Sequence, residues 1–298
     1  MTYTLLIGDR GYSSWSLRGW LLFEAFGIAV KCRRMQLGGP EHAARLAEFA
    51  PARTVPALRL PEGAVVWDSL AIAETLHERH PEAGIWPADP GLRVLARSVA
   101  AEMHAGFVAL RADCPMNLRA AYADFAPSDP VRADLGRIEA LWSHALDQSG
   151  GPWLCGDYSA VDAFFAPVAA RIAGYALPVG AQAAGYVAAH LADPAFRRWR
   201  AMGLVDGPDQ SRYAMPALAQ QPWPGPAPLP LPAEAVETGP SVNAACPYSG
   251  APVSDFARIE GRVWGFCNPF CRDKTMADAA AWPAFMALRA SHGATAAG

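Results

Sequence analysis

The first 85 residues alternate between the hydrophobic spacing of strands and that of helices. Residues 3–7 form a buried apolar run, and Leu17, Trp20 and Leu21 then recur on one face of a helical pattern. The elements expected from this alternation are strands at about 3–7, 30–35, 55–60 and 64–67, and helices at about 16–26, 41–49 and 69–78. Their order predicts a mixed sheet that contains a right-handed β-α-β crossover.

From residue 90 to about 205 the pattern becomes purely helical. Apolar residues recur at helical spacing over 92–112 and 131–148, and residues 158–176 are strongly apolar. Ser159 and Asp162 have the spacing of a capping box, which marks the start of a helix. We therefore predict an all-helical domain with the helix after Ser159 buried in its middle.

Composition and charge exclude several classes of protein. The chain has 298 residues, of which 52% are hydrophobic and 18% are charged, so wholesale disorder is excluded. The 25 basic residues are scattered and outnumbered by 28 acidic ones, which leaves no basic patch for nucleic acid. No apolar run reaches the roughly 18 residues of a membrane span. We expect a cytoplasmic protein without a nucleic-acid or membrane partner.

Prolines and cysteines are unevenly distributed. Nine of the 27 prolines lie between positions 208 and 240, and every second residue of 222–232 is proline. This composition predicts an extended spacer at 206–242. Three of the six cysteines lie in 243–298, and the other three are isolated, as in a reduced cytosolic chain. Because residues 243–298 have little apolar area, we expect a metal or docking onto the main body to stabilise them.

A cluster of serines lies where the first strand gives way to the first helix. Free backbone N–H groups and the positive end of the helix dipole stabilise an anion such as a thiolate at this point. No histidine or aspartate forms an obvious triad with Ser13, Ser14 or Ser16. This favours a serine that donates a hydrogen bond to a bound anion over a hydrolase nucleophile. A simple set of helix N-caps is the alternative.

Two further features accompany these serines. Val55 and Pro56 open a strand, where a proline often marks a cis bond and leaves the preceding backbone free to pair with a ligand. Asp68 and Ser69 open a helix and suit the ammonium and carboxylate groups of an amino-acid-like ligand. The three features in this order indicate a site for such a ligand.

This order of features resembles the cytosolic glutathione transferases over about residues 1–205. Ser-Ser-Trp-Ser-Leu-Arg at 13–18 is similar to the SSCSWR motif of the zeta class, the maleylacetoacetate isomerases. The resemblance implies a thioredoxin-like α/β glutathione-binding domain at 1–84, an all-helical bundle domain at 90–205 and a homodimer. Because Trp15 replaces the cysteine of the motif and Glu41 replaces a glutamine, the resemblance supports the superfamily and not the class.

The resemblance also implies roles for single residues. Ser13 would activate the glutathione sulfur, with Ser14 as the second candidate. The residues implied to bind glutathione are Ser16, Arg18, Glu41, Thr54, Val55, Pro56, Asp68 and Ser69. The second substrate, a small electrophile, would contact Met103, His104, Phe107 and Arg111. We predict that Arg111 and Arg119 bind an acidic substrate, and solvated or domain-interface arginines are the alternative.

The last three cysteines have the spacing of metal ligands. Cys246, Cys267 and Cys271 place three thiolates within reach of one ion. The segment resembles the YHS and TRASH-like zinc modules, with Ser249 in place of the second cysteine of their CPxCG motif. The resemblance implies a small α+β, zinc-ribbon or treble-clef-like module at 243–298.

Structural zinc prefers four ligands, so we expect Asp273, His292, water or a partner to complete this site. A metal-free fold with reactive thiols and plain buried cysteines are the alternatives. Two functions follow. The first is a glutathione transferase-like enzyme that conjugates glutathione to a small electrophile or isomerises it. The second is a non-catalytic glutathione-binding scaffold whose cysteine module senses metal or redox state.

Overall fold

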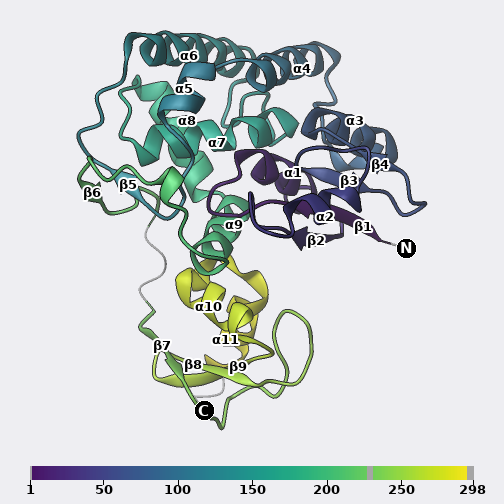
Figure 1. The fold of residues 1–298 in the computed structure, drawn as a ribbon, viewed down its shortest axis with the longest axis vertical. Coiled ribbons are helices and arrows are strands. Elements are labelled where there is room, and N and C mark those ends of the chain that lie inside the picture. Colours follow the sequence, from purple (N-terminus) through teal and green to yellow (C-terminus); the bar gives the residue numbers. More distant parts are fainter. Residues whose placement is uncertain (1, 227–230, 294–298) are drawn as a thin grey trace. The chain divides into compact units, whose positions relative to one another are not determined.

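The computed structural model describes residues 2–226 and 231–293 and divides the chain into two compact units (Figure 1). Unit 1 comprises Met1–Ala192 and Gly207–Gly225, and unit 2 comprises Asp193–Asp206 and Pro226–Gly298. The chain therefore leaves unit 1, returns to it and leaves it again. Within the described ranges, none of the helices has both the length and the apolar character that crossing a bilayer requires.

Unit 1 begins with a four-stranded mixed sheet and three helices. The strands are β1 (Tyr3–Ile7), β2 (Val30–Arg34), β3 (Ala57–Arg59) and β4 (Val65–Val66), in the order β2-β1-β3-β4. The helices are α1 (Ser14–Glu24), α2 (His42–Ala47) and α3 (Ser69–Arg79), followed by the 3-10 turn η1 (Pro81–Ala83). Strand β1 pairs in parallel with β2 and antiparallel with β3, which confirms the predicted mixed sheet.

A short chain of hydrogen bonds fixes the beginning of α1. Ser13 is the N-cap, and its Oγ accepts a hydrogen bond from the N–H of Ser16 at 3.3 Å. The same hydroxyl donates to Ser16 Oγ at 2.8 Å, and Ser16 Oγ accepts from the N–H of Gly8 at 2.8 Å. Leu17 and Leu21 of the predicted apolar face are fully buried. Hydrogen bonds within the protein therefore fix the loop between β1 and α1.

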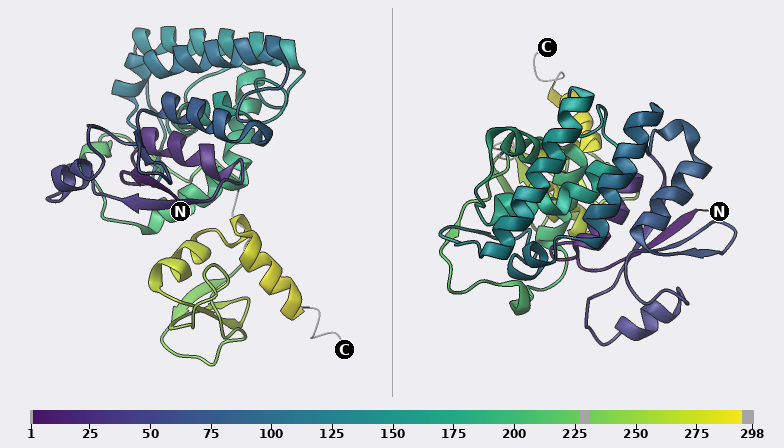
Figure 2. Two further views of the ribbon diagram at one scale, coloured as in Figure 1. Left: turned by 90° about the vertical axis from the view of Figure 1, so that its right-hand side faces the viewer. Right: turned by 90° about the horizontal axis from the view of Figure 1, so that it is seen from above.

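The rest of unit 1 is mainly helical. Its helices are α4 (Pro90–Ala105), α5 (Val108–Asp113), α6 (Asp129–Ser149), α7 (Ala160–Gly174) and α8 (Ala181–Ala192). Helix α7 contacts α1, α4 and α8 and is almost wholly buried, as its apolar sequence predicts. The predicted capping box of Ser159 and Asp162 begins it. Helices α4 and α6 lie side by side (Figure 2).

The single helix predicted over 92–112 is two helices in the structure. Gly106 follows the last residue of α4 in an extended conformation, and Phe107 then has a φ of 57° before α5 begins. A Cβ at Gly106 would lie 2.8 Å from the carbonyl oxygen of Glu102, so the break requires a residue without one. Gly106 is the only glycine in residues 92–112, and the predicted helix is interrupted at this residue.

The final part of unit 1, Gly207–Gly225, is called the returning segment below. It contains the 3-10 turn η2 (Ser211–Tyr213) and the strand β6 (Gln220–Gln221). Strand β6 pairs antiparallel with β5 (Ala121–Tyr122). These residues are part of a folded unit, and not of a free spacer.

Unit 2 combines one helix with the C-terminal part of the chain. Its antiparallel sheet has the strands β7 (Ala233–Val236), β8 (Asp255–Ile259) and β9 (Arg262–Phe266), in the order β7-β8-β9. Its helices are α9 (Pro194–Val205), α10 (Pro269–Ala277), the 3-10 turn η3 (Ala279–Ala281) and α11 (Pro283–Gly293). Helix α10 contacts all three strands and α9.

The division into units differs from the predicted domain boundaries. The sequence places residues 193–206 in the helical domain, whereas α9 belongs to unit 2, where Arg197 forms an ion pair with Asp278 at 2.7 Å. The predicted spacer at 206–242 is divided, because the returning segment belongs to unit 1 and β7 to the sheet of unit 2. Part of the predicted polyproline run, residues 227–230, lies outside the described residues.

Candidate functional site

A cavity of about 450 Å³ lies at the N-terminus of α1 in unit 1. Ser13 and Ser14 line it from the beginning of the helix. Arg111 lines it from α5, Arg171 from α7 and Tyr213 from the returning segment. Hydroxyl and guanidinium groups from distant parts of the sequence therefore share one cavity.

The two serine hydroxyls differ in their partners. Both side chains are buried, and both lie at the positive end of α1. The Ser13 hydroxyl is bonded to Ser16, whereas no residue in the described ranges forms a hydrogen bond with the Ser14 hydroxyl. Ser16 is fully buried and supports Ser13, and it is not among the residues that line the cavity.

Two arginines contact Trp15. The guanidinium carbons of Arg18 and Arg111 lie 4.4 Å and 4.7 Å from the centre of its ring. Arg18 is 1% exposed, and its Nε and Nη1 have no hydrogen-bond partner among the described residues. Burial, and then repulsion by Arg171 and Arg111, lower the pKa of Arg18 to about 9, although Asp68 partly offsets this. The Arg18 cation is thus buried without a counter-ion of its own.

Arg171 is also buried, but backbone carbonyls satisfy it. Its Nε donates to the oxygen of Cys114 at 2.8 Å, and its Nη1 donates to the oxygen of Pro167 at 3.1 Å. Burial, followed by repulsion from Arg111, lowers the pKa of Arg171 to about 10, and burial lowers the pKa of Arg111 as well. Within the described ranges, no carboxylate forms an ion pair with either side chain. Uncompensated positive charge at a cavity favours an anionic ligand.

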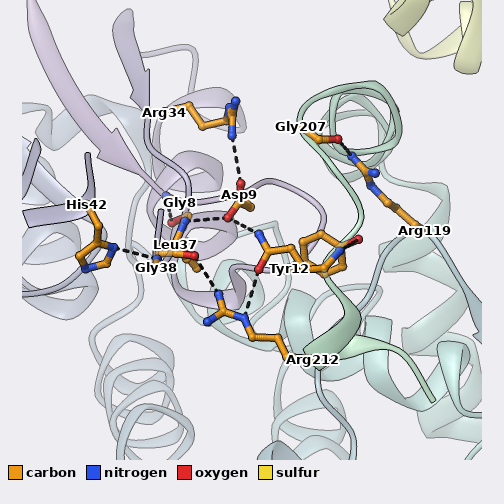
Figure 3. A network of polar contacts seen from close by, with 12 residues as sticks. Gly8, Asp9, Tyr12, Arg34, Leu37, Gly38, His42, Arg119, Gly207 and Arg212 are labelled. Carbon is orange, nitrogen blue, oxygen red and sulfur yellow. Dashed lines mark hydrogen bonds and ion pairs between the residues drawn. The ribbon is translucent and has the colours of Figure 1, made fainter. Parts of the chain in front are cut away.

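Arg119 is bound to the returning segment. Its Nη1 forms an ion pair with Asp209 at 2.7 Å. Its Nη2 donates to the oxygen of Gly207 at 2.8 Å (Figure 3). Arg119 thus already has a counter-ion from a residue far along the chain and does not line the cavity, and its binding of an acidic substrate stays a prediction. Arg171 was not predicted, although it is the one basic residue in the apolar sequence 158–176.

A polar network attaches the returning segment to the loops beside the cavity (Figure 3). The carboxylate of Asp9 accepts hydrogen bonds from the N–H of Leu37 at 2.8 Å and from Gln210 Nε2 at 2.5 Å. The Oη of Tyr12 accepts from the N–H of Gln210 at 3.2 Å. The Tyr12 ring stacks on Tyr213, with 4.8 Å between the ring centres. These contacts fix Tyr213 as a wall of the cavity.

Asp68 and Ser69 begin α3, as predicted. One oxygen of Asp68 accepts from the N–H of Leu70 at 3.0 Å, and the other pairs with His104 Nε2 at 3.0 Å. Ser69 is fully buried, and its Oγ has no hydrogen-bond partner among the described residues. Asp68 is thus already engaged, whereas Ser69 retains an unsatisfied hydroxyl.

The other residues implied to bind glutathione lie outside the lining of the cavity. The Val55–Pro56 peptide bond is cis, as the sequence predicts, and Val55 is half-buried. Thr54 is exposed, and Glu41 is exposed beside Arg45, with which it forms an ion pair at 3.0 Å.

Only Arg111 of the four predicted second-substrate residues lines the cavity. Met103 and Phe107 are buried, and His104 pairs with Asp68. The His104 ring also packs edge-on against Trp15, with 5.1 Å between the ring centres. These three residues therefore support the site and do not line it.

The six cysteines are all free and fall into two groups. Burial raises the pKa of Cys32 to about 11 and those of Cys114 and Cys155 to about 12, so these thiols of unit 1 stay protonated at neutral pH. In unit 2, the sulfur atoms of Cys246, Cys267 and Cys271 lie within 4.8 Å of one another. This predicted grouping is called the cysteine cluster below.

The cysteine cluster stabilises a thiolate at one position. Burial raises the pKa of Cys246, but backbone N–H groups of Tyr248, Cys267 and Ser249 donate to its sulfur and bring the pKa down to about 7. Burial raises the pKa of Cys271 to about 12, although the Lys274 ammonium favours its thiolate. The cluster as a whole is a set of soft donors suited to a thiophilic ion.

Comparisons with known proteins agree with the geometry of unit 1. Residues 12–79 match the model of the glutathione S-transferase N-terminal domain. A probable maleylacetoacetate isomerase of Caenorhabditis elegans is 33% identical over 90 residues, which are 30% of this chain and 41% of that protein. The chain thus matches less than half the length of this relative.

Solved structures resemble a larger part of the chain. A glutathione transferase homologue from Burkholderia, with bound glutathione, has a TM-score of 0.54 and 21% identity over 68% of this chain and 98% of that one. A maleylacetoacetate isomerase from Anaeromyxobacter dehalogenans, with glutathione in its active site, has a TM-score of 0.51 and 25% identity over 70% and 98%. Residues 12–79 thus match the glutathione S-transferase N-terminal domain, and the chain shares the fold of these solved structures over 68–70% of its length.

Proposed function

We propose that unit 1 binds glutathione, stabilises its thiolate with the serines at the beginning of α1, and adds that thiolate to a small anionic electrophile. One observation carries the proposal: Ser13 and Ser14 share their cavity with Arg111 and Arg171. The hydroxyls suit a thiolate, and the guanidinium groups suit the charge of the second substrate. Conjugation retains the new carbon–sulfur bond, whereas isomerisation breaks it again after rotation about the former double bond.

The thiolate is stabilised by hydrogen bonds and by the helix dipole. A free thiol has a pKa of about 8.5, so lowering this value to near neutrality raises the thiolate fraction at pH 7 about tenfold or more. We assign Ser13 as the leading donor. Its bond with Ser16 can reverse, because a hydroxyl can rotate, and Ser16 then donates to Ser13 at the same 2.8 Å separation. The proton of Ser13 is then free to reach the sulfur.

The rest of glutathione is proposed to extend toward β3 and α3. The backbone of Val55 pairs with the cysteinyl part, beside Pro56. Ser69 binds the γ-glutamyl carboxylate, because its unsatisfied hydroxyl lies at the N-terminus of α3. Asp68 would have to exchange its contact with His104 for the ammonium group. By the same resemblance, we expect a cytoplasmic homodimer.

Ser13→Ala and Ser14→Ala test the thiolate step. Removing one preorganised donor from a developing anion typically costs about a hundredfold to a thousandfold in kcat. We expect a loss of this size for Ser13→Ala, a smaller loss for Ser14→Ala, and little change in the dissociation constant of glutathione. Steady-state kinetics with calorimetry measure both quantities. A wild-type protein that binds glutathione but turns over no electrophile would instead support the non-catalytic scaffold.

Arg111→Met tests the charge of the second substrate. A pair of electrophiles that differ only in a carboxylate and its methyl ester should respond differently. We expect KM for the carboxylate to rise about tenfold to a hundredfold, the equivalent of about 1.4 to 2.7 kcal/mol, and KM for the ester to change little. Equal effects on the two electrophiles would remove the proposed role of Arg111.

A second candidate function rests on the cysteine cluster. We infer that Cys246, Cys267 and Cys271 hold zinc, which would join β9 and α10 to the turn after Cys246. Three sulfurs bound to one zinc at about 2.3 Å lie about 3.8 Å apart, and the sulfurs of Cys267 and Cys271 are 3.9 Å apart. Native mass spectrometry with and without a chelator is the test. A mass without zinc from a metal-replete preparation would contradict it.

A further inference from the structure

The cysteine cluster contains three donors from two parts of the chain. Cys246 precedes a tight turn in which the N–H of Gly250 bonds to its carbonyl oxygen at 2.9 Å. Cys267 follows β9, and Cys271 lies in the first turn of α10. Within the described ranges, no fourth histidine, cysteine, aspartate or glutamate joins them. A four-coordinate ion would therefore obtain its last ligand from elsewhere.

The two predicted fourth ligands are used in other contacts. Asp273 forms an ion pair with Arg272 at 2.7 Å. His292 Nε2 contacts the oxygen of Val242 at 3.1 Å, and its Nδ1 contacts the oxygen of Leu288 at 2.9 Å. Neither belongs to the cysteine cluster, so the expectation that one of them completes it is not met.

Ser249 occupies the side on which a fourth ligand would approach. Its Oγ lies 3.3 Å from Cys267 Sγ and accepts from the N–H of Ala251 at 3.3 Å. Ser249 is exposed and Cys267 is partly exposed, whereas Cys246 and Cys271 are 2% and 8% exposed. The cluster is thus closed on the side of Cys246 and Cys271 and accessible beside Ser249.

The surroundings of the sulfurs suit a complex with excess negative charge. Asn268 Nδ2 lies 3.2 Å from Cys267 Sγ, and the backbone donors described above reach Cys246. The Lys274 ammonium near Cys271 lies 3.9 Å and 4.0 Å from the ring centres of Tyr248 and Trp282. These donors and this cation compensate thiolate charge, and a fourth thiolate would add one more negative charge to the complex.

We propose that the metal-loaded cysteine cluster is an open three-thiolate site that binds the thiolate of a small thiol beside Ser249, and that glutathione is this thiol. The proposal rests on the zinc site proposed above. In the binding step, the thiol proton is released to solvent, a water molecule leaves the ion, and a metal–sulfur bond forms with no change of oxidation state. Unit 2 would then be a second glutathione site, independent of Ser13.

Cobalt substitution of the full chain tests this proposal. Bound Co²⁺ absorbs visible light, and its spectrum reports how many thiolates surround it. We expect glutathione to shift the wild-type spectrum toward that of Ser249→Cys, in which the chain itself supplies a fourth sulfur. Glutathione should leave the spectrum of Ser249→Cys unchanged.

S-methylglutathione and Ser13→Ala are the matched controls. S-methylglutathione has no free thiol and should leave the wild-type spectrum unchanged, and Ser13→Ala should show the full glutathione-dependent shift. A wild-type spectrum that already matches Ser249→Cys, or one that glutathione does not move, overturns the open site but leaves zinc binding intact. Failure to bind Co²⁺ or Zn²⁺ overturns both. Loss of transferase activity alone overturns neither.

Discussion

The cavity of unit 1 is lined by guanidinium cations, whereas the cysteine cluster of unit 2 gathers thiols that become anions when they bind a metal. In unit 1, Arg18 is a buried cation with unpartnered nitrogens, and Arg111 has no carboxylate partner among the described residues. In unit 2, three thiols, which lose their protons when they bind a metal, are gathered around one point. An excess of one sign at a buried site is costly unless a ligand of the other sign compensates it. The comparison is the reason why we propose an anionic ligand for the first region and a cation for the second.

The two regions also differ in which parts of the chain supply their chemical groups. The cavity combines side chains from α1, α5 and α7, so it depends on the packing of the whole of unit 1. The cysteine cluster draws its ligands from residues 246–271 and uses backbone N–H donors of the same stretch. Side-chain substitutions should consequently change the cavity strongly, and they should change the cluster strongly only at the cysteines themselves.

Of the expected effects, the largest should be the loss of zinc affinity when one cysteine of the cluster is replaced. Structural zinc with four ligands contributes about 10–16 kcal/mol, so Cys267→Ser should cost on the order of 3–4 kcal/mol of zinc affinity, several hundredfold or more. Competition with a chromophoric chelator measures this affinity. Cys155→Ser, which removes a buried thiol of unit 1, is the control and should leave zinc binding unchanged. Equal zinc affinity in the two variants would contradict the assignment of the cluster to a cation.

Arg18→Met should stabilise the fold while weakening the site. Replacing a buried charge that lacks a counter-ion by an apolar side chain of similar length relieves its desolvation, and the lost contact with Trp15 offsets part of this gain. We expect the free energy of unfolding to rise by about 1–2 kcal/mol. Chemical denaturation measures it. Arg97→Met, which breaks an ion pair with Glu74, should slightly lower it. Destabilisation by Arg18→Met would show that an unidentified partner satisfies Arg18.

Asp162 provides a contrast to Arg18, because it is a buried carboxyl group whose oxygens are hydrogen-bonded. It accepts from the N–H groups of Leu154 and Ser159 and from Tyr186 Oη. Burial raises its pKa to about 6, above the unfolded value of about 3.9. The folded state then binds the proton more tightly, so this contribution to stability is lost as pH rises through 6.

The measurement is the difference in unfolding free energy between wild type and Asp162→Asn as a function of pH. Going from pH 7 to pH 5 should stabilise the wild type by about 1.4 kcal/mol relative to this variant, which cannot titrate at 162. A pH-independent difference would place the pKa of Asp162 near its ordinary value, and the hydrogen bonds would then outweigh burial.

Of these variants, Tyr12→Phe should have the smallest effect on stability and on KM. It removes the hydrogen bonds of the Tyr12 hydroxyl with Gln210 and Asp209 but retains the stacking on Tyr213, so we expect a loss of at most about 1 kcal/mol of stability and a KM for the electrophile within about threefold of wild type. Tyr12→Ala removes the stacking as well and should raise KM further. If Tyr12→Phe equals Tyr12→Ala, the hydrogen bond and not the stacking holds the wall of the cavity.

Much of unit 1 could be predicted because its signals are local. The strands and helices of residues 3–79 follow the alternation of apolar spacing closely, and the caps at Ser13, Asp68 and Ser159 lie within a few residues of the helices they begin. The cysteine cluster was also predictable, because its ligands have a short spacing. The caps join near neighbours in sequence, and the three cysteines all lie within residues 246–271.

The arginines could not be predicted in the same way. Arg111 and Arg119 look equivalent in the sequence, but a counter-ion 90 residues away engages only Arg119. Arg171 belongs to an apolar helix, and its position at the cavity depends on the packing of α7 against α1. Helix α9 likewise follows the helical domain in sequence and folds with unit 2 because of Asp278. These outcomes depend on tertiary contacts.

The path of the chain has a consequence for how the two units can be separated. Since the returning segment follows α9 and carries Tyr213, truncation after residue 205, the predicted end of the transferase, would remove a wall of the cavity together with unit 2. Truncation after Gly225 would leave α9 attached to unit 1 without α10 and η3, against which it packs. No single cut of the chain yields two intact units, because each unit comprises two separate stretches of sequence. Neither unit can therefore be inherited or exchanged as one continuous segment.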